Sequence, residues 1–316
     1  MSYCFITGTI HCATLEQFSA SYGPPLFCLG ITEHNSYSIQ LYNWDLAKLP
    51  EPYLLAHVSI SSKPVFLSFT NPDCKSLLCL TSNGHILIFS VQMTQSGFTL
   101  QPSHDQQLLH SSDFIQSADL SFQWQSLAIA THKGVYHVDL SSLSSTPIFH
   151  PVPSSPVVSV AVTFSNEILA GCLDGMVVNL STKTSIHLHS PVTSISASPH
   201  NPRLFVGGLA NGKCLALQLT EASKTVLTKL SCFSVCTSSL TGILFMGDDV
   251  IISSFAGKVT RVSHSALVNE SDISDEGMSL LLSEEPLALV DTSINGLGSL
   301  LLTVSEASSI KLIPIE

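Results

Sequence analysis

The segment VTSISASPHNPRLFVGGLANGKCLALQL, residues 192–219, contains the pattern that decides the fold of this chain. Three apolar runs of strand length are separated first by a loop rich in Pro and Asn, and then by the turn Ala210-Asn211-Gly212. Short apolar runs bounded by such turn residues are typical of antiparallel β-strands. The segment therefore predicts a three-stranded antiparallel unit.

The glycine of this turn recurs along the chain, each time between two short apolar runs. The five turns are Ser82-Asn83-Gly84, His132-Lys133-Gly134, Leu173-Asp174-Gly175, Ala210-Asn211-Gly212 and Phe255-Ala256-Gly257. Their glycines are separated by 50, 41, 37 and 45 residues. A period of about 40 to 50 residues with strands on both sides of a turn is typical of β-propeller blades.

Seven units of this kind can be marked along the chain. They cover residues 25–46, 65–91, 118–140, 157–180, 192–219, 232–262 and 287–315. A fourth, outer strand is expected from the segment after each unit, for example residues 225–230 after the fifth. For the seventh unit, residues 3–10 are predicted to supply that strand and so to close the last blade. The sequence thus predicts a single all-β domain over residues 1–316, a seven-bladed WD40-like β-propeller with few, short helices.

Composition narrows the partners that this chain is expected to bind. Hydrophobic residues make up 45% of the chain and charged residues only 11%, so another protein is expected to cover part of the surface. The net charge of −11, with only 12 Lys and Arg, argues against direct nucleic-acid binding, because phosphate binding needs clustered cations. Apolar runs are strand-sized and the first residues lack a signal-peptide pattern, so neither membrane insertion nor secretion is predicted.

The cysteines indicate a reducing, intracellular compartment. There are nine, an odd number, and Cys28, Cys79, Cys172 and Cys214 lie in apolar runs, where they are predicted to be buried free thiols. Cys232 and Cys236 are predicted to point to one face of a strand, as packed thiols and not as a metal site.

Common enzyme motifs such as G-x-S-x-G, the phosphate-binding G-x-x-x-x-G-K-[ST] and H-E-x-x-H do not occur in the sequence. His187 and His189 have a spacing that can bind a transition metal, but an exposed outer strand is favoured because no further ligands are evident. Asp248 and Asp249 are predicted to form a turn. No catalytic, cofactor-binding or metal-binding residue is assigned, and neither a cofactor nor a small-molecule substrate is expected.

Two features of the sequence are predicted to have structural roles, and for one segment two interpretations remain. Asp174 is predicted to order its turn, and Trp44-Asp45 matches the dipeptide that gives WD repeats their name. The acidic, Ser-rich segment 266–285 is predicted to be a solvated loop, with a docking or phosphorylation segment as the alternative.

With these units in place, the whole chain resembles the nucleoporin 43 family, the small WD40-repeat nucleoporins of the Y-shaped outer-ring complex of the nuclear pore. The resemblance lies in the closing strand 3–10, LFCLGITEHNSYSIQLYNW (26–44), VTFSNEILAGCLDGMVV (162–178), SPHNPRLFVGGLANG (198–212) and the acidic insertion before the last blade. The usual Trp-Asp pairs are missing from most units.

This resemblance implies a non-enzymatic scaffold that binds an α-solenoid nucleoporin and supports nucleocytoplasmic transport. It implies a location at the nuclear envelope, in the nuclear pore complex, with kinetochores as a further location. A scaffold of this kind is expected to carry hydrophobic or aromatic residues in loops on one face, and their replacement is expected to abolish partner binding without unfolding. The partner-binding residues themselves are unassigned.

Two alternatives remain open. Residues 118–124, ADLSFQW, and 194–200, SISASPH, also resemble propeller hydrolases of the diphthine methylesterase type. Such an enzyme would use His132, His137 and Asp139, but the sequence offers no recognisable nucleophile beside them. The other alternative is a WD40 adaptor, either a ubiquitin-ligase substrate receptor or a trafficking adaptor, which only the identity of the partner separates from the scaffold.

Overall fold

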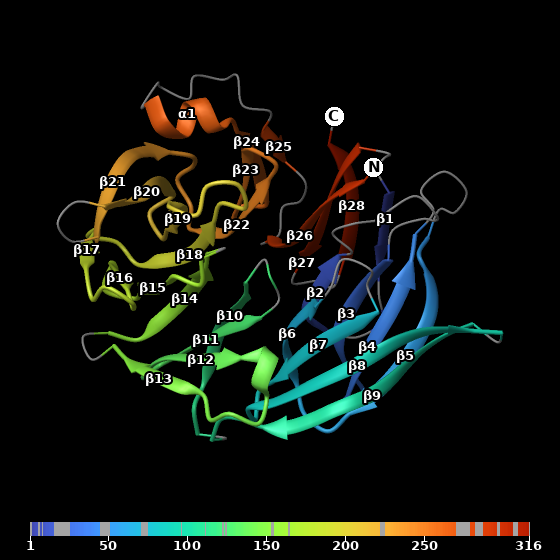
Figure 1. The fold of residues 1–316 in the computed structure, drawn as a ribbon. Coiled ribbons are helices and arrows are strands. Elements are labelled where there is room, and N and C mark those ends of the chain that lie inside the picture. The colour runs from blue at the N-terminus through green and yellow to red at the C-terminus, as the bar shows by residue number, and fades with distance from the viewer. Residues whose placement is uncertain are drawn as a thin grey trace. The chain divides into compact units, whose positions relative to one another are not determined.

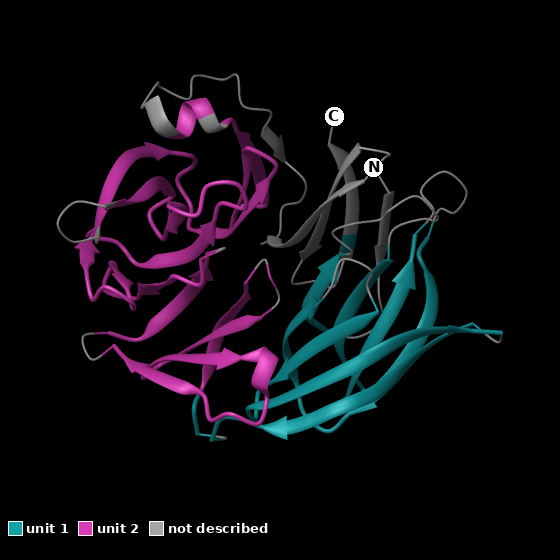
Figure 2. Ribbon diagram, in the orientation of Figure 1, with its two compact units in different colours: residues 1–113, 290–316 teal, residues 114–289 magenta. Residues whose placement is uncertain are grey.

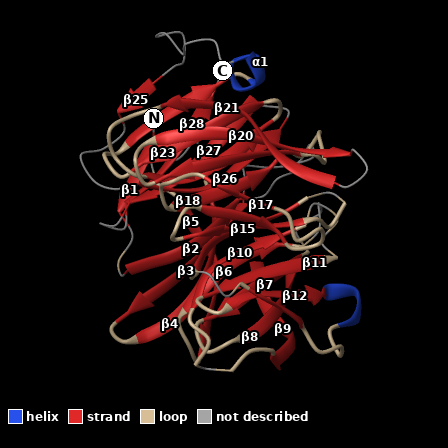
Figure 3. Cartoon of the chain, turned by 90° about the vertical axis from the view of Figure 1, so that its left-hand side faces the viewer, coloured by secondary structure: helices blue, strands red, loops and turns tan. Residues whose placement is uncertain are grey.

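The structure is a computed structural model that describes residues 2–5, 7, 9–15, 26–44, 51–70, 75–95, 97–110, 112–121, 123, 125–152, 155–163, 165–221, 225–269, 279–281, 287–295, 298–305 and 309–315. Strands dominate these residues (Figure 3), as the sequence predicts. Within them the helices are one 3₁₀ turn, η1 (Leu140–Ser142), and the six-residue α1 (His264–Asn269). The all-β class is therefore confirmed.

The chain divides into two compact units (Figure 2). Unit 1 comprises residues 1–113 and 290–316, and unit 2 comprises residues 114–289. Strands within each unit are organised in sheets of four, with one repeated order in which most strands pair with their neighbours in sequence (Figure 1).

Unit 1 is built from three of these sheets in the described part of the chain. In spatial order, the first holds β2 (Thr9–Leu15), β3 (Leu26–Glu33), β4 (Ser36–Asn43) and β5 (Tyr53–Ile60); the second holds β6 (Pro64–Phe69), β7 (Ser76–Thr81), β8 (His85–Thr94) and β9 (Gly97–Gln107); the third holds β1 (Ser2–Phe5), β28 (Ser309–Ile315), β27 (Gly298–Ser305) and β26 (Leu287–Asn295).

Unit 2 is built from four sheets among its described residues. The first sheet holds β10 (Ile115–Leu120), β11 (Ser126–Thr131), β12 (Gly134–Asp139) and β13 (Ile148–Pro151), and the second holds β14 (Val157–Val162), β15 (Ile168–Cys172), β16 (Met176–Asn179) and β17 (Ser185–His187). The third sheet holds β18 (Val192–Ala197), β19 (Leu204–Leu209), β20 (Lys213–Glu221) and β21 (Thr225–Ser234). The fourth sheet holds β22 (Leu240–Met246), β23 (Asp249–Ser254), β24 (Lys258–Val262) and β25 (Ser279–Leu281). β21 confirms that the segment after the fifth predicted unit supplies an outer strand.

The predicted closing strand 3–10 is two strands. β1 pairs antiparallel with β28, with Cys4 opposite Ile310, and forms the outer edge of that sheet. Residues 9 and 10 instead begin β2, which pairs with β3. β2 buries Ala13 and Leu15 in a cluster with Phe27, and this burial favours a separate first strand. The prediction is therefore wrong for residues 9 and 10.

The recurring glycines sit where the chain must turn between the second and third strands of a sheet. Gly84, Gly175, Gly212 and Gly257 have φ between 76° and 89°, a left-handed conformation that glycine adopts without strain. Each donates its N–H to the carbonyl three residues earlier, as in Gly212 to Leu209 at 3.1 Å. A Cβ on Gly84 would lie only 2.6 Å from the carbonyl oxygen of Leu109, so close packing also demands glycine here.

Each of these turns is tied to the start of the first strand of its own sheet. Leu173 N–H donates to Pro156 O at 3.0 Å, Ala210 N–H to Pro191 O at 3.0 Å and Phe255 N–H to Ser239 O at 2.8 Å. The acceptors Pro156, Pro191 and Ser239 immediately precede β14, β18 and β22. The turns therefore lie at the end of each sheet where its first strand begins.

The first strands of unit 2 run side by side in one direction. Ser159, near the start of β14, donates its Oγ–H to the carbonyl of Val192 at the start of β18, at 3.0 Å. Asp119, near the end of β10, accepts from the N–H of Val162 at the end of β14, at 2.7 Å. Gly208, opposite Ser194 near the start of β18, packs on Leu240 at the start of β22. All four glycine turns of unit 2 therefore face the same end of its sheets.

Where the structure describes their side chains, second strands are buried along most of their length, and β11, β15 and β19 are buried along all of it. Because neighbouring sheets cover both of their faces, these strands read as continuous apolar runs without polar alternation. Outer strands such as β17 alternate between exposed and half-buried residues. This contrast explains why the sequence marks second strands clearly and outer strands poorly.

The acidic segment 266–285 lies largely outside the described residues. Its described parts are the last residues of α1 and the short outer strand β25. In the part of the chain that the structure describes, no helix combines the length and the apolar character that crossing a membrane requires.

Candidate functional site

The three residues suggested for a hydrolase, His132, His137 and Asp139, do not converge. His132 lies in the turn between β11 and β12, and its ring is 5.5 Å from that of Phe114. His137 and Asp139 lie toward the far end of β12. Asp139 accepts from Ser141 N–H at 2.9 Å and Ser141 Oγ–H at 2.6 Å, and so begins η1. It is a capping residue.

His137 has a different partner that sequence reasoning missed. Its Nε2 lies 2.6 Å from the Oγ of Ser126, the first residue of β11. Thr131 lies opposite Gly134, so counting back along the hairpin places Ser126 opposite Asp139 and beside His137. The register that the His132-Lys133 turn imposes is a signal that could have found this pair.

The Ser126–His137 pair has the elements of a nucleophile and a base. Burial lowers the pKa of His137, and the nearby Asp139 carboxylate opposes this more weakly, so the imidazole is neutral near pH 7. A neutral imidazole can accept the Ser126 proton, which is the first requirement of acyl transfer. However, Ser126 is only 3% exposed, so the hydroxyl is closed to a substrate in this conformation.

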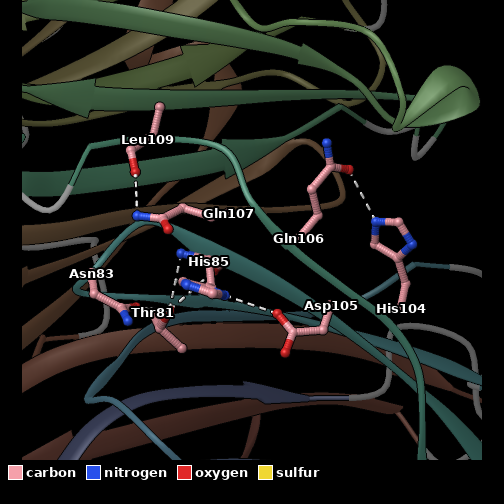
Figure 4. Close-up of polar contacts among 8 residues, drawn as sticks. All are labelled: Thr81, Asn83, His85, His104, Asp105, Gln106, Gln107 and Leu109. Atoms are coloured by element: carbon pink, nitrogen blue, oxygen red, sulfur yellow. Dashed lines mark hydrogen bonds and ion pairs between the residues drawn. The ribbon is translucent and has the colours of Figure 1, made fainter.

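A second polar group orders the sheet β6–β9 (Figure 4). Thr81 Oγ1 donates to Asn83 Oδ1 at 2.7 Å and accepts from His85 N–H at 3.2 Å, which holds the turn before β8. His85 Nδ1 lies 2.8 Å from Asp105 Oδ1 across β8 and β9. Since the Asp105 side chain is 62% exposed, this pair is a solvated surface contact worth little stability.

The outer strand β9 adds two further contacts to this group. Gln107 Nε2 donates to the carbonyl of Leu109 at 3.2 Å, and His104 Nε2 lies 3.2 Å from Gln106 Oε1. These contacts link neighbouring residues of one strand and its exit, so they order the backbone locally (Figure 4).

The cysteine and histidine pairs that were considered as metal sites, and not favoured as such, are packing or surface residues. Cys232 packs with the cluster that contains Leu217, whereas Cys236 packs with the cluster that contains Leu240. The prediction that they share a face is wrong, because β21 ends at Ser234 and the next two N–H groups bond to the carbonyl of Gly212. In the described residues, no group of three or more His, Cys, Asp or Glu could hold a metal ion.

His187 ends the exposed strand β17, as predicted, and its ring lies edge-on to that of His189 at 4.5 Å. The predicted turn at Asp248 is also confirmed, since Gly247 has a φ of 61°. Asp249 begins β23 and accepts from Arg261 Nε at 2.7 Å.

The structural roles of Asp174 and Trp44 are confirmed. Asp174 Oδ1 accepts from Met176 N–H at 3.0 Å and so orders the turn before the third strand. Trp44 is fully buried beside Phe27, with ring centroids 6.3 Å apart. Asp45 lies outside the described residues.

The four cysteines predicted to be buried free thiols are both buried and free. Burial raises the pKa of Cys172 to about 11 and that of Cys79 to about 12, and it raises the pKa of Cys28 and Cys214 further. Structural cysteines of this kind are chemically inert.

Iodoacetamide is therefore expected to leave these four thiols unmodified in the native protein at mildly alkaline pH. Against an ordinary pKa of 9.0, even Cys172 holds about a hundredfold less thiolate. The measurement is peptide mass spectrometry of native and urea-unfolded samples, with half-buried Cys232 and Cys236 as internal controls. Equal labelling of Cys214 and Cys232 in the native protein would contradict the burial.

Asp119 links two first strands of unit 2 through its bond from Val162 N–H. Burial raises the pKa of Asp119 to about 7, against the opposing effect of backbone hydrogen bonds from Val162 and Leu120. Because the folded pKa is above the unfolded value of 3.8, the folded state binds this proton more tightly. Stability from this group is present below about pH 4 and is lost as pH rises to about 7.

Asp119→Asn is expected to remove this loss, since an amide oxygen can still accept from Val162 N–H. Near pH 4 the variant and the wild type should have the same free energy of unfolding. Above pH 7 the free energy of unfolding of the variant should be about 2 to 4 kcal/mol higher than that of the wild type. Urea unfolding across this pH range measures the difference, with exposed Asp248→Asn as the control. Parallel wild-type and variant profiles would rule the effect out.

Several large apolar side chains of unit 2 are exposed in the glycine turns or the loops next to them. Phe114 is 68% exposed, Leu173 51% and Phe255 55%. Phe114 immediately precedes β10, Leu173 lies between β15 and β16, and Phe255 lies between β23 and β24. All three therefore lie at the end of the sheets where the first strands begin. These three residues fit the apolar loop residues that a scaffold is expected to present at one end.

The chain was compared with known proteins, and neither a protein-family model nor a curated protein matches it.

Proposed function

We propose that this chain is a non-enzymatic protein–protein interaction scaffold, a structural subunit of the outer-ring (Y) complex of the nuclear pore. The observation that carries the scaffold role is the exposure of Phe114, Leu173 and Phe255 at one end of unit 2. Soluble proteins rarely leave several large apolar side chains exposed at one end unless a partner covers them. The assignment to the outer ring rests on the resemblance to the nucleoporin 43 family.

A seven-bladed WD40-like propeller is the architecture that we propose for this scaffold. Two features support it: the four-stranded sheets repeat one strand order, and β1 completes the sheet of β26–β28 as a closing N-terminal strand would. In this role the chain binds an α-solenoid nucleoporin at the nuclear envelope and kinetochores, and so supports nucleocytoplasmic transport.

Affinity purification of the tagged chain from cells at moderate salt, followed by mass spectrometry, tests this function. We expect outer-ring nucleoporins in stoichiometric amounts, and a fluorescent fusion at the nuclear rim. Recovery of ubiquitin-ligase subunits or of trafficking coat proteins in their place would assign the chain to the adaptor class. A soluble monomer without partners would overturn the scaffold proposal.

A hydrolase is the second candidate, because Ser126 Oγ lies 2.6 Å from His137 Nε2. In that chemistry Ser126 Oγ attacks an ester carbonyl and His137 Nε2 takes its proton; the alcohol leaves with that proton, and water then releases the acid. The test is hydrolysis of a peptide methyl ester by the wild type, Ser126→Ala and a control, Ser141→Ala. Activity lost in Ser126→Ala alone would favour the hydrolase, and no activity in any of them would favour the scaffold.

A further inference from the structure

The glycine-turn end of unit 2 forms a defined surface, which we call the turn-end surface. Its residues come from all four sheets of the unit and are Phe114, His132, Lys133, Leu173, Asp174, Asn211, Lys213, Phe255 and Lys258. They stand in the turn between the second and third strands, at the first position of the third strand, or just before the first strand.

Hydrogen bonds hold the backbone of this surface from two sides. On one side the turns donate to the residues that precede the first strands, as in Phe255 N–H to Ser239 O at 2.8 Å. On the other side the glycine carbonyls accept from the residues that follow the outer strands, as in Leu188 N–H to Gly175 O at 2.9 Å. The apolar side chains are thus presented on a preordered backbone, which lowers the entropy cost of binding.

The charge of the turn-end surface is opposite to that of the whole chain. The chain has a net charge of −11, but this surface holds three lysines against one aspartate. Lys133 and Lys213 are exposed and Lys258 is half-buried. The carboxylate of Asp174 already accepts the N–H of Met176 at 3.0 Å, so part of its capacity is used within the turn. The surface therefore favours negative charge in a ligand.

We infer that the turn-end surface binds an acidic protein segment that carries aromatic or aliphatic side chains, and this inference rests on the proposed scaffold function. Phe114, Leu173 and Phe255 would contact the apolar side chains, while Lys213 and Lys258 would face the carboxylates. The exposed apolar side chains indicate that a partner binds here, and the lysines indicate that this partner is acidic.

A protein segment suits this surface better than a nucleic acid. The three lysines stand on three separate sheets, and none of the surface residues is an arginine. Nucleic-acid surfaces cluster Lys and Arg to neutralise successive phosphates, and the three lysines of this surface form no such cluster in the sequence.

The test is fluorescence anisotropy of the full chain with four synthetic probes of equal length. One peptide alternates Glu or Asp with Leu or Phe, a second replaces its apolar residues with Ser, a third replaces its acidic residues with Lys, and the last probe is oligo(dT). We expect the first peptide to bind at least about tenfold more tightly than the others, with an affinity that falls as salt is added.

Matched variants then locate the binding site. Phe255→Ala and the double variant Lys213→Glu/Lys258→Glu should each weaken the first peptide by about tenfold or more. Two controls on outer strands of the same unit, Ile148→Ala at 60% exposure and exposed Lys229→Glu, should bind as the wild type does. Circular dichroism checks that every variant is folded. Equal losses in the controls, or tighter binding of the basic peptide or oligo(dT), would overturn the inference.

Failure of the inference and failure of the scaffold function give different results. If outer-ring nucleoporins co-purify equally with the wild type and with Lys213→Glu/Lys258→Glu, the scaffold function stands and the inference fails. If none co-purify but the acidic apolar peptide binds and the variants abolish its binding, the inference stands and the outer-ring assignment fails.

Discussion

Replacing Gly212 with alanine is expected to lower the free energy of unfolding of unit 2 by about 3 kcal/mol. Gly212 has a φ of 78°, which costs an alanine about 1 kcal/mol. The new Cβ would also collide with the carbonyl oxygen of Cys236. Relief of that collision would break the bonds from Val235 and Cys236 N–H to the Gly212 carbonyl, which are 3.0 and 3.3 Å long. Urea denaturation followed by circular dichroism measures the loss.

Gly97→Ala is a matched control for this substitution. Gly97 also has a positive φ, 125°, but a Cβ there would meet nothing within 4 Å. Its cost should be limited to backbone strain, about 1 kcal/mol. If both substitutions cost the same, the packing of the turn against the exit of β21 contributes nothing to the stability of the protein.

Phe205→Ala is expected to destabilise unit 2 by about 3 to 5 kcal/mol. Phe205 lies on β19, is fully buried and packs in a cluster with Leu169, Val192 and Leu217 from three strands. Removal of the ring loses its buried apolar area and leaves a cavity between sheets that cannot close around it. Thermal unfolding and urea titration both measure the effect.

The control for Phe205→Ala is Phe255→Ala, in which a ring that is 55% exposed is removed. This change should alter the free energy of unfolding by less than about 0.5 kcal/mol. A loss as large as that of Phe205→Ala would mean that Phe255 supports the sheet and is not free to bind a partner.

The sequence predicted those elements that depend on local chemistry. The turn at Gly212 follows from the left-handed backbone that glycine permits, and the runs that became β19 and β20 follow from burial on both faces. The free, buried state of Cys28 and Cys79 was also predictable, because each lies inside an apolar run.

Elements that depend on distant partners were harder to predict. Residues 9 and 10 were assigned to the closing strand, and no strand was predicted for residues 11–15, because nothing local reveals that β2 pairs with β3. The divergence of Cys232 and Cys236 depends on bonds to the Gly212 carbonyl from the residues after Ser234, where β21 ends. Counting residues back from the turn could have placed Ser126 near His137. Their hydrogen bond, however, depends on the register between β11 and β12.

The sequence predicted that a scaffold would expose apolar residues in loops on one face, but it did not identify the residues of the turn-end surface. From sequence, Leu173 and Phe255 are the first residues of two glycine turns, and nothing local shows whether their side chains are buried. Only the folded turn leaves them exposed, because a tight turn gives its first residue no neighbouring strand.

The pairing of β1 with β28 also determines when this chain can finish folding. Cys4 and Ile310 lie opposite each other, yet a ribosome adding about 5 to 20 residues per second needs at least about 15 seconds to make the second after the first. Throughout that time β1 has no partner strand, while β2 can already pair with β3. The sheet of β1 and β26–β28 therefore cannot form in full until β28 has been made, and a nascent chain stalled before β28 would expose an unpaired edge to chaperones.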